Sequence, residues 1–352
     1  MDTRRISIDE LAGAPIMAGG ELFGSEATIA DPVVVVDLDI PVGVSGHIAQ
    51  AAQRACASEV ILVGTSRRPI DDAIHPVVSA LDLTYAPEAD HREVVGAEDV
   101  DLALAGFLDA VRQCPTAALV VAQVIRVAEP LDPIRALDVE SFAYSTLQGG
   151  PEFGRWLAAR RAQNRPLPPP ALDPVLLDRV DDTLRITLNR PERRNAYGTA
   201  LRDALVEALR VAIADATIGR LVLDGAGTSF CAGGDLDEFG HMPDATTAHL
   251  VRTRGGAGRL MAALADRVEV RLHGHCVGAG IEIPSFATRV VATPDTHLLL
   301  PEVSMGLIPG AGGTVSVPRR IGRWRALHLF VTGADIDASQ ALSWGLIDAI
   351  ED

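Results

Sequence analysis

Apolar and polar residues alternate at two places in the second half of the chain. Residues 184–188 and 268–272 place leucine, isoleucine or valine at every second position, a period that predicts strands. Residues 201–214 and 246–264 have helical spacing instead, and Gly255 and Gly256 interrupt the second of these. Shorter apolar runs at residues 220–223, 290–291 and 298–300 predict further strands. Strands separated by helices are typical of an α/β fold.

The first half of the chain has a less explicit pattern. Residues 33–36 and 60–63 are short apolar runs that predict buried strands, with a helix over 47–56 between them. Three further helices are predicted over residues 99–112, 115–127 and 138–161. Nothing in this pattern indicates chemistry, so the simplest interpretation is a packed α/β region.

A proline-rich segment divides the two halves. Five prolines lie between Arg165 and Pro174, and proline at that density blocks helix and favours extended chain. The segment predicts a linker over residues 166–175. It would separate an N-terminal region, residues 1–165, from a C-terminal core, residues 176–352.

The composition excludes several classes of partner. The net charge is −16, which disfavours nucleic acid and anionic membranes as partners. The chain contains no lysine, so all 31 basic residues are arginine and a P-loop is excluded. No apolar run reaches the roughly 18 residues of a membrane helix, and the polar N-terminus predicts no signal peptide. The scattered cysteines predict reduced thiols and a cytoplasmic location: Cys56, Cys114, Cys231 and Cys276.

Three glycine-rich stretches in the second half are candidates for ligand binding: residues 229–236, 273–282 and 300–314. Glycines after strands let the backbone approach a ligand and expose its N–H groups. Two such loops could hold one thioester oxygen in an oxyanion hole, and a helix opening near Gly280 would add its dipole. Each stretch alone is also compatible with a tight turn that has no function.

Two glutamates accompany these loops. Glu282 and Glu302 lie in apolar sequence, which raises the pKa of a carboxyl group and suits it to acid–base catalysis. The alternative for Glu302 is a helix cap or a pair with an arginine. His273 and His275 provide only two ligands, too few for a zinc site, so no metal is predicted.

The C-terminal half resembles the enoyl-CoA hydratase/isomerase (crotonase) superfamily. The matching stretches occur in family order and cover residues 186–196, 230–236, 274–282, 301–313 and 332–350. The resemblance implies a spiral of ββα units, assembled as a homo-oligomer of three or six chains. It also implies an acyl-CoA thioester as substrate, with CoA as part of that substrate and no separate cofactor.

The resemblance assigns roles to four residues. Gly234 and Ala279 would supply the oxyanion-hole N–H groups, and Glu282 and Glu302 match the two acids of hydratases. In that mechanism one carboxylate activates a water that attacks the β-carbon of a 2-enoyl-CoA. The other glutamate delivers a proton to the α-carbon.

The same resemblance implies a CoA-binding segment. Its predicted residues are Arg193, Arg194, Asn195, Ala196, Ala232 and Asp235. Arginine side chains are reasonable phosphate partners, although a solvated loop is an equal alternative. Family members often use a lysine at the phosphates, and here Arg160 or Arg161 would have to replace it.

The order of segments departs from the family in one respect. Members usually continue as helices beyond the part that matches residues 345–350, and residues 113–162 resemble that helical tail but lie upstream. Our hypothesis is that residues 1–165 are a degenerate crotonase-like unit whose tail helices cover the second unit. The loop at residues 238–248 and the N-terminal region are then expected to line the acyl pocket.

Having both glutamates favours a hydratase. Within the family, a Δ3-Δ2 enoyl-CoA isomerase needs one acid and no attacking water, and thioester hydrolysis or decarboxylation would use the same fold. An alternative of another class is a non-catalytic CoA-binding or scaffold subunit.

Overall fold

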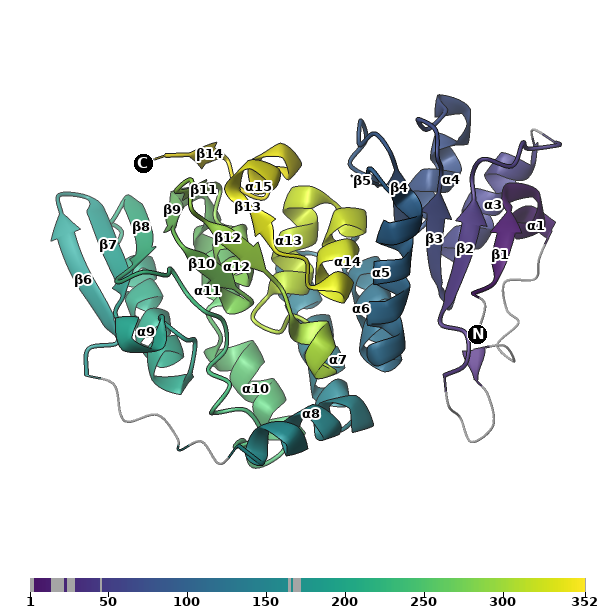
Figure 1. The fold of residues 1–352 in the computed structure, drawn as a ribbon. Coiled ribbons are helices and arrows are strands. Elements are labelled where there is room, and N and C mark those ends of the chain that lie inside the picture. Colours follow the sequence, from purple (N-terminus) through teal and green to yellow (C-terminus); the bar gives the residue numbers. More distant parts are fainter. Residues whose placement is uncertain are drawn as a thin grey trace.

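The computed structural model describes residues 3–13, 22–23, 29–44, 46–163, 166 and 172–351. Two largely parallel sheets lie at opposite ends of the molecule, with helices packed between them (Figure 1). Residues 167–171 of the predicted linker lie outside the described residues, and its last residue begins strand β6 (Val175–Val180).

The N-terminal sheet follows the order of the chain. Its parallel strands are β1 (Arg5–Ser7), β2 (Val33–Asp37), β3 (Ile61–Thr65), β4 (Leu83–Ala86) and β5 (Val94–Gly96). Strands β2 and β3 confirm the two predicted strands. The other three were not predicted, because strands of three or four residues are too short to display a period.

Both faces of this sheet are buried. Val35 points into the core shared with the helices at the centre of the molecule, whereas Val36 points into a second core. That second core is formed with α1 (Ile8–Gly13), α3 (Gly46–Cys56) and α4 (His75–Ala80). Burial on both sides explains why β2 and β3 are uninterrupted apolar runs.

Four helices follow: α5 (Val100–Gln113), α6 (Pro115–Ala128), α7 (Pro133–Gln148) and α8 (Pro151–Arg161). The prediction of one helix over 138–161 is wrong, because α7 ends before Gly149 and α8 starts at Pro151. Proline has no N–H to donate within a continuing helix but fits the first helical position. Among the described residues no single helix is long and apolar enough to cross a membrane, and α5 and α6 meet that test only as a pair bent by 107°.

The C-terminal sheet has the strand order β14-β11-β9-β8-β7-β6. Its members are β6, β7 (Thr183–Leu188), β8 (Arg220–Gly225), β9 (Val268–Leu272), β11 (Arg289–Ala292) and β14 (Ala349–Ile350). All neighbours are parallel except the β6–β7 hairpin. A small sheet contains β10 (His275–Val277), β12 (His297–Leu299) and β13 (Ile336–Asp337). The predicted strands of this half are confirmed.

The helices of the C-terminal half are α9 (Thr199–Ala214), α10 (Ala245–Gly255), α11 (Gly258–Leu264), α12 (Ala279–Glu282), α13 (Gly313–Ile321), α14 (Arg323–Thr332) and α15 (Ala338–Trp344). The predicted helix 246–264 is interrupted at Gly256, as expected. The structure therefore confirms an α/β fold in both halves.

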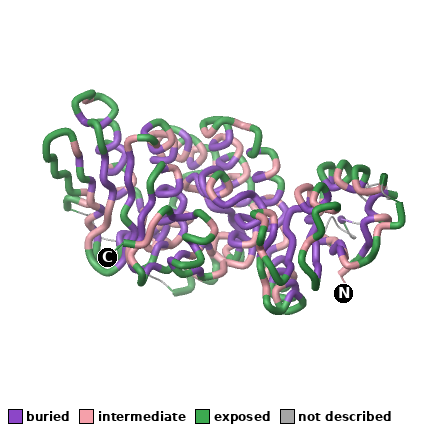
Figure 2. The backbone as a smooth tube through the Cα atoms, turned by 90° about the horizontal axis from the view of Figure 1, so that it is seen from above, coloured by how far each residue is buried: buried purple, intermediate pink, exposed green. Residues whose placement is uncertain are grey.

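One hydrophobic core joins the two halves. It contains residues of the N-terminal strands, of α5 and α6, and of the C-terminal sheet and α14. The Tyr85 hydroxyl of β4 and Nδ1 of His328 on α14 are hydrogen-bonded at 2.8 Å. Buried residues accordingly continue through the centre of the molecule as well as through each sheet (Figure 2). Helices α6 and α7 pack on α13, as the tail hypothesis requires.

Candidate active site

A cavity of about 490 Å³ lies between the glycine-rich loops and helix α7. Five of the residues predicted from sequence line it: Gly234, Asp235, Ala279, Glu282 and Glu302. Residues 238–242 also line it, in agreement with the predicted acyl-pocket loop. The N-terminal half contributes Leu137, Glu140, Ser141, Tyr144 and Gln148, all from α7. The cavity is therefore built by both halves of the chain.

The first two glycine-rich loops run side by side. Cys231 and Cys276 form a parallel β-bridge between them. A Cβ on Gly280 would lie 2.4 Å from the carbonyl oxygen of Cys231, so only glycine permits this approach. Gly278 has a φ of 49°, in the left-handed region that favours glycine.

The close approach leaves two backbone N–H groups available at the cavity wall. No described residue accepts a hydrogen bond from the N–H of Gly234 or of Ala279, and both residues line the cavity. Ala279 is the first residue of α12, as predicted for a helix near Gly280. That helix ends at Glu282, and Pro284 starts a separate 3₁₀ turn, Pro284–Phe286. The dipole expected to add to the oxyanion hole is therefore that of a single helical turn, and its contribution stays a prediction.

Glu282 is held in position by the start of α13. Its Oε2 accepts hydrogen bonds from the N–H groups of Ala311 (2.6 Å) and Gly313 (2.9 Å). Its Oε1 accepts none from a described residue. A Cβ on Gly313 would lie 2.6 Å from Cγ of Glu282, so the glycine leaves room for this side chain. The third glycine-rich stretch thus orients the carboxylate.

A third carboxyl group, which the sequence did not identify, occupies the other N–H groups of the same turn. Glu140 of α7 accepts from the N–H of Gly312 (2.8 Å) and from both the N–H (2.9 Å) and Oγ1 (2.7 Å) of Thr314. Successive amides of one loop therefore alternate between Glu282 and Glu140. Because Glu140 belongs to the N-terminal half, that half does contribute to the site.

Glu302 lies at the start of a 3₁₀ turn, Glu302–Met305. Its Oε2 is buried and has no hydrogen-bond partner among the described residues. The alternative of a pair with an arginine is wrong, since no ion pair of a described arginine involves Glu302. A Cβ on Gly278 would lie 2.4 Å from Oε1 of Glu302, so this acid approaches the backbone just before Ala279.

Burial raises the pKa of all three carboxyl groups. For Glu302 the negative charge of Glu282 adds to burial and holds the pKa well above its usual range. For Glu140, too, burial and then Glu282 raise the pKa. The N–H groups of Ala311 and Gly313 partly oppose burial at Glu282. The two N–H groups on Glu282 and the charge of Glu282 on Glu302 thus make Glu282 the stronger acid of the pair, a difference that can separate a base from an acid.

The predicted CoA-binding residues are not grouped at the cavity, and several of them contact other parts of the chain instead. The Asn195 side chain is occupied by backbone, since its Oδ1 accepts from the Arg190 N–H and its Nδ2 donates to the carbonyls of Ser229 and Phe230. Arg193 pairs with the buried carboxylate of Asp235 at 2.6 Å. These contacts fix the shape of the loop that carries Gly234.

The other three predicted CoA-binding residues differ in their exposure to solvent. Arg194 is exposed, Ala232 is half-buried and Ala196 is buried. The two arginines of α8 contact the loop beside the cavity: Arg160 pairs with Asp237 at 2.6 Å, and Arg161 donates to the Gly240 carbonyl at 2.9 Å. CoA binding by these residues stays a prediction.

A signal for Glu140 was present in the sequence. The buried positions of α7 are Ala136, Leu137, Glu140, Ser141, Tyr144 and Leu147. Glu140 therefore lies on the buried face of α7, where a charged residue is rare without a partner, although exposed Ile134 and Phe142 on the same helix weaken that signal. Its partners, however, lie more than 170 residues away along the chain, and no local pattern identifies them.

Comparisons with known proteins agree with the C-terminal resemblance. The sequence model of the enoyl-CoA hydratase/isomerase family matches residues 180–351. A 2,3-dehydroadipyl-CoA hydratase of Escherichia coli (strain K12) is 34% identical over 176 residues, which cover 50% of this chain and 68% of the relative. A 1,2-epoxyphenylacetyl-CoA isomerase of the same organism is 36% identical over 174 residues, which cover 48% of this chain and 66% of the relative.

Among solved structures, Pseudomonas aeruginosa AtuE is 32% identical with a TM-score of 0.47, and the match covers 51% of this chain and 70% of that one. An enoyl-CoA hydratase from Thermoplasma volcanium GSS1 is 30% identical with a TM-score of 0.46, and the match covers 51% of this chain and 73% of that one. The sequence matches, and the family motifs that meet at one cavity, show that the chain belongs to the enoyl-CoA hydratase/isomerase family.

Proposed function

We propose that this protein adds water across the double bond of a 2-enoyl-CoA thioester. The observation that carries the proposal is that Glu282 and Glu302 line one cavity together with the N–H groups of Gly234 and Ala279, which donate to no described residue. An oxyanion hole and two acids of opposite protonation state are what hydration through an enolate needs.

Each group has a defined part in the reaction. The N–H groups of Gly234 and Ala279 would donate to the thioester oxygen and stabilise the negative charge that develops there. Ionised Glu282 takes a proton from water through its free Oε1 while the water oxygen bonds to the β-carbon. The displaced electron pair forms the enolate, and protonated Glu302 then delivers its proton to the α-carbon. Proton exchange between the two carboxyl groups and solvent restores the starting state.

The relatives support CoA thioesters as the substrate class, because the names of both the hydratase and the isomerase specify one. Isomerisation is the second candidate, since one relative is named an isomerase and that reaction needs only one acid. A homo-oligomer of three or six chains and a cytoplasmic location stay predictions.

Hydration of crotonyl-CoA, followed by loss of the enoyl-thioester absorbance, tests the proposal. We expect turnover by the purified chain, and a loss on the order of 10²–10⁴ in kcat for Glu282→Gln and for Glu302→Gln. Glu192→Gln is the matched control, because the Glu192 side chain is 67% exposed. It should retain full activity.

Other outcomes separate the alternatives. Loss of isomerase activity with only one of the two glutamine variants would identify an isomerase. Binding of CoA thioesters without turnover of 2-enoyl or 3-enoyl substrates would contradict the proposal and favour a scaffold role.

A further inference from the structure

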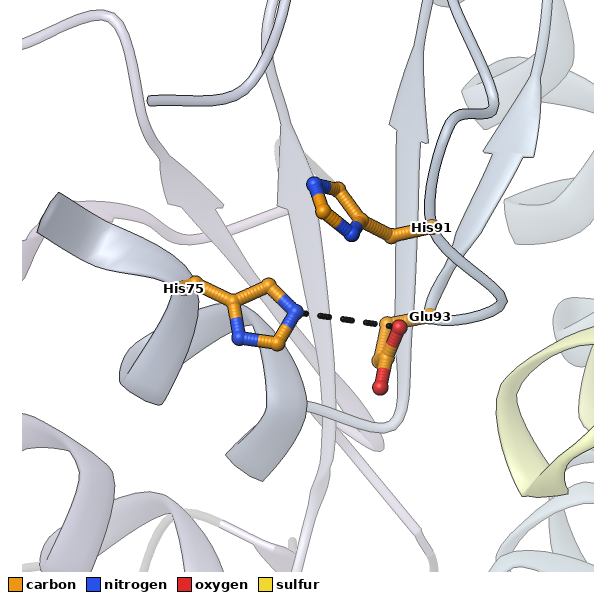
Figure 3. A group of neighbouring side chains, drawn as sticks. All are labelled: His75, His91 and Glu93. Atoms are coloured by element: carbon orange, nitrogen blue, oxygen red, sulfur yellow. Dashed lines mark ion pairs between the residues drawn. The ribbon is translucent and has the colours of Figure 1, made fainter. Parts of the chain in front are cut away.

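Two imidazoles and a carboxylate converge in the N-terminal half, on the N-terminal sheet and its α4 helix (Figure 3). His75 is the first residue of α4, and His91 and Glu93 lie immediately before β5. One ligand atom from each of the three lies within 4.8 Å of the other two. Among the described residues this is the one group of at least three histidine, cysteine or acidic side chains with such spacing.

The contacts of these side chains are incomplete without a further partner. Nε2 of His75 is buried and has no hydrogen-bond partner among the described residues. The nearest carboxylate atom, Oε2 of Glu93, is 3.8 Å away, beyond hydrogen-bonding distance. The His75 and His91 ring centroids lie 4.8 Å apart and the rings are tilted by 54°, so they do not stack. A buried polar atom left without a partner is rare in native proteins.

We propose that His75, His91 and Glu93 bind a divalent transition-metal ion, with zinc the best fit. Two imidazoles and one carboxylate are a ligand set that zinc prefers. Ligands at zinc distances lie about 3.4 Å apart in a tetrahedron, so the observed spacing needs only small side-chain rotations. Oδ1 of Asp72 lies 3.9 Å from Nε2 of His91, so this carboxylate can hold the His91 ring while the other ring nitrogen faces His75 and Glu93 (Figure 3).

The ion has a structural role in this position. It connects the start of α4 to the segment before β5, and both parts contact α14: the Ser79 carbonyl of α4 accepts a hydrogen bond from Arg323 at 2.7 Å. The His91 carbonyl in that segment accepts a hydrogen bond from Arg325 of α14 at 3.2 Å. A metal bound only by the folded chain stabilises it by mass action. The site does not depend on the proposed hydration reaction.

Zinc titration of the chelator-treated full chain, by calorimetry, tests the proposal. We expect one equivalent to bind, and binding at least about tenfold weaker in His91→Ala, since loss of a ligand removes one of three protein donors. His275→Ala is the matched control, because His275 is exposed and distant in sequence. Cys56→Ser tests the exposed thiol as a competing site, and it should also bind like the wild type.

Cobalt provides an independent readout. Co²⁺ in the tetrahedral site should give visible absorption bands that His75→Ala and His91→Ala lose. Absence of stoichiometric zinc binding, or equal binding by wild type and both histidine variants, would overturn the proposal.

A second observation concerns the cavity and rests on the proposed function. Arg252 of α10 lines the cavity, and its guanidinium lies over the Tyr144 ring, 4.4 Å from the centroid. Its Nε donates to Oγ of Ser141 (3.2 Å) and its Nη1 to Oε1 of Gln148 (3.3 Å); Nη2 contacts Oγ of Ser145. All of these partners are neutral.

No described carboxylate forms an ion pair with Arg252, and burial lowers its pKa. Glu140 opposes that effect, but Glu140 itself favours its protonated form. A partly buried cation without a counter-ion is costly, and an anionic ligand group would offset that cost.

We infer that Arg252 binds a carboxylate at the far end of the acyl chain. The substrate class is then a 2-enoyl-CoA derived from a dicarboxylic acid. Neutral serine and glutamine side chains hold the guanidinium in place, and an anionic acyl terminus supplies the missing charge.

The test compares two six-carbon 2-enoyl-CoA substrates, one ending in a carboxylate and one in a methyl group. We expect kcat/KM to favour the carboxylate substrate at least about tenfold in the wild type, and Arg252→Gln to bring this ratio close to one. Arg252→Lys should retain part of the preference. Equal losses on both substrates in Arg252→Gln would reduce Arg252 to a link between α7 and α10 and overturn the inference.

Binding separates this inference from the proposed reaction. Calorimetry with the saturated adipyl-CoA and hexanoyl-CoA needs no turnover. If neither enoyl substrate reacts but adipyl-CoA binds more tightly through Arg252, the reaction is wrong and the ligand class stands.

Discussion

The two sheets of this protein share one arrangement, but the cavity with Glu282 and Glu302 lies at only one of them. In the N-terminal sheet, β1 to β5 are parallel and adjacent in chain order, and in the C-terminal sheet β7, β8, β9, β11 and β14 are as well. The loops that follow the strands differ. In the N-terminal half, Asp39 accepts from Oγ of Ser66 (2.8 Å) and the N–H of Arg67 (2.9 Å), so a carboxylate of the chain itself occupies the loop.

In the C-terminal half, two backbone N–H groups of the loops face the cavity and are available to a ligand. Glycine at 278 and 280 lets the loops approach, and no described residue accepts a hydrogen bond from the N–H groups of Gly234 and Ala279. The comparison teaches that strand order provides the scaffold, whereas the proposed activity depends on loop N–H groups that no described residue accepts from. We propose on this basis that residues 1–165 are a degenerate crotonase-like unit that retains its helices over the other unit.

The largest expected effect on stability is at the ion pair that joins helix α6 to the residue before strand β4. Arg126 of α6 pairs with the buried Asp82, with Nε 2.6 Å from Oδ1. Arg126→Met removes the closest partner of that carboxylate and leaves Arg323, 3.5 Å from Oδ1, as its remaining ion-pair partner. The free energy of unfolding should fall by about 2–4 kcal/mol, measured by urea denaturation. Arg185→Met breaks the more exposed pair with Asp224 in the C-terminal sheet and should cost at most about 1 kcal/mol. Equal losses would contradict this difference.

The next effect is on activity. Gly280→Ala places a methyl group against the Cys231 carbonyl and separates the two loops, so kcat for crotonyl-CoA should fall on the order of 10²–10³. The same substitution at Gly106 in α5 meets open space. It should leave kcat unchanged and stabilise the chain by up to about 1 kcal/mol. An active Gly280→Ala protein would show that the close approach is not needed.

The third prediction concerns pH. A carboxyl whose pKa is higher in the folded chain than in the unfolded chain binds protons more tightly when folded. Its stabilising contribution is therefore full below the unfolded pKa and is lost as pH rises through the folded pKa. Glu302→Gln should raise the free energy of unfolding by about 1–3 kcal/mol at pH 8 and by little at pH 4. Denaturation at the two pH values measures this, and a pH-independent difference would argue against a raised pKa.

The smallest effect tests the comparison directly. Asp39→Asn weakens the contacts that close the N-terminal loop, so the free energy of unfolding should fall by about 1 kcal/mol. Hydration activity should not change, because this loop is outside the cavity. A loss of activity would show that the N-terminal sheet does more than support the helices.

Much of the C-terminal half was predictable because its signals are local. The alternation at residues 184–188 and 268–272 placed strands correctly, and the glycine-rich stretches with Glu282 and Glu302 identified the cavity wall. The N-terminal half was harder, since β1, β4 and β5 are short and the break between α7 and α8 was overlooked at Gly149 and Pro151. Asn195, predicted to bind CoA, is engaged with backbone, an arrangement that depends on three separate segments.

The sequence by itself determined the family, the α/β class and the two candidate catalytic acids, because periodicity, glycine and local polarity act within a few residues of one another. Only the tertiary structure decided that Glu140 and α7 complete the cavity, that Glu302 pairs with none of the described arginines, and that His75, His91 and Glu93 converge. Burial and the proximity of charges depend on which distant segments pack together, and those contacts leave no periodic trace along the chain.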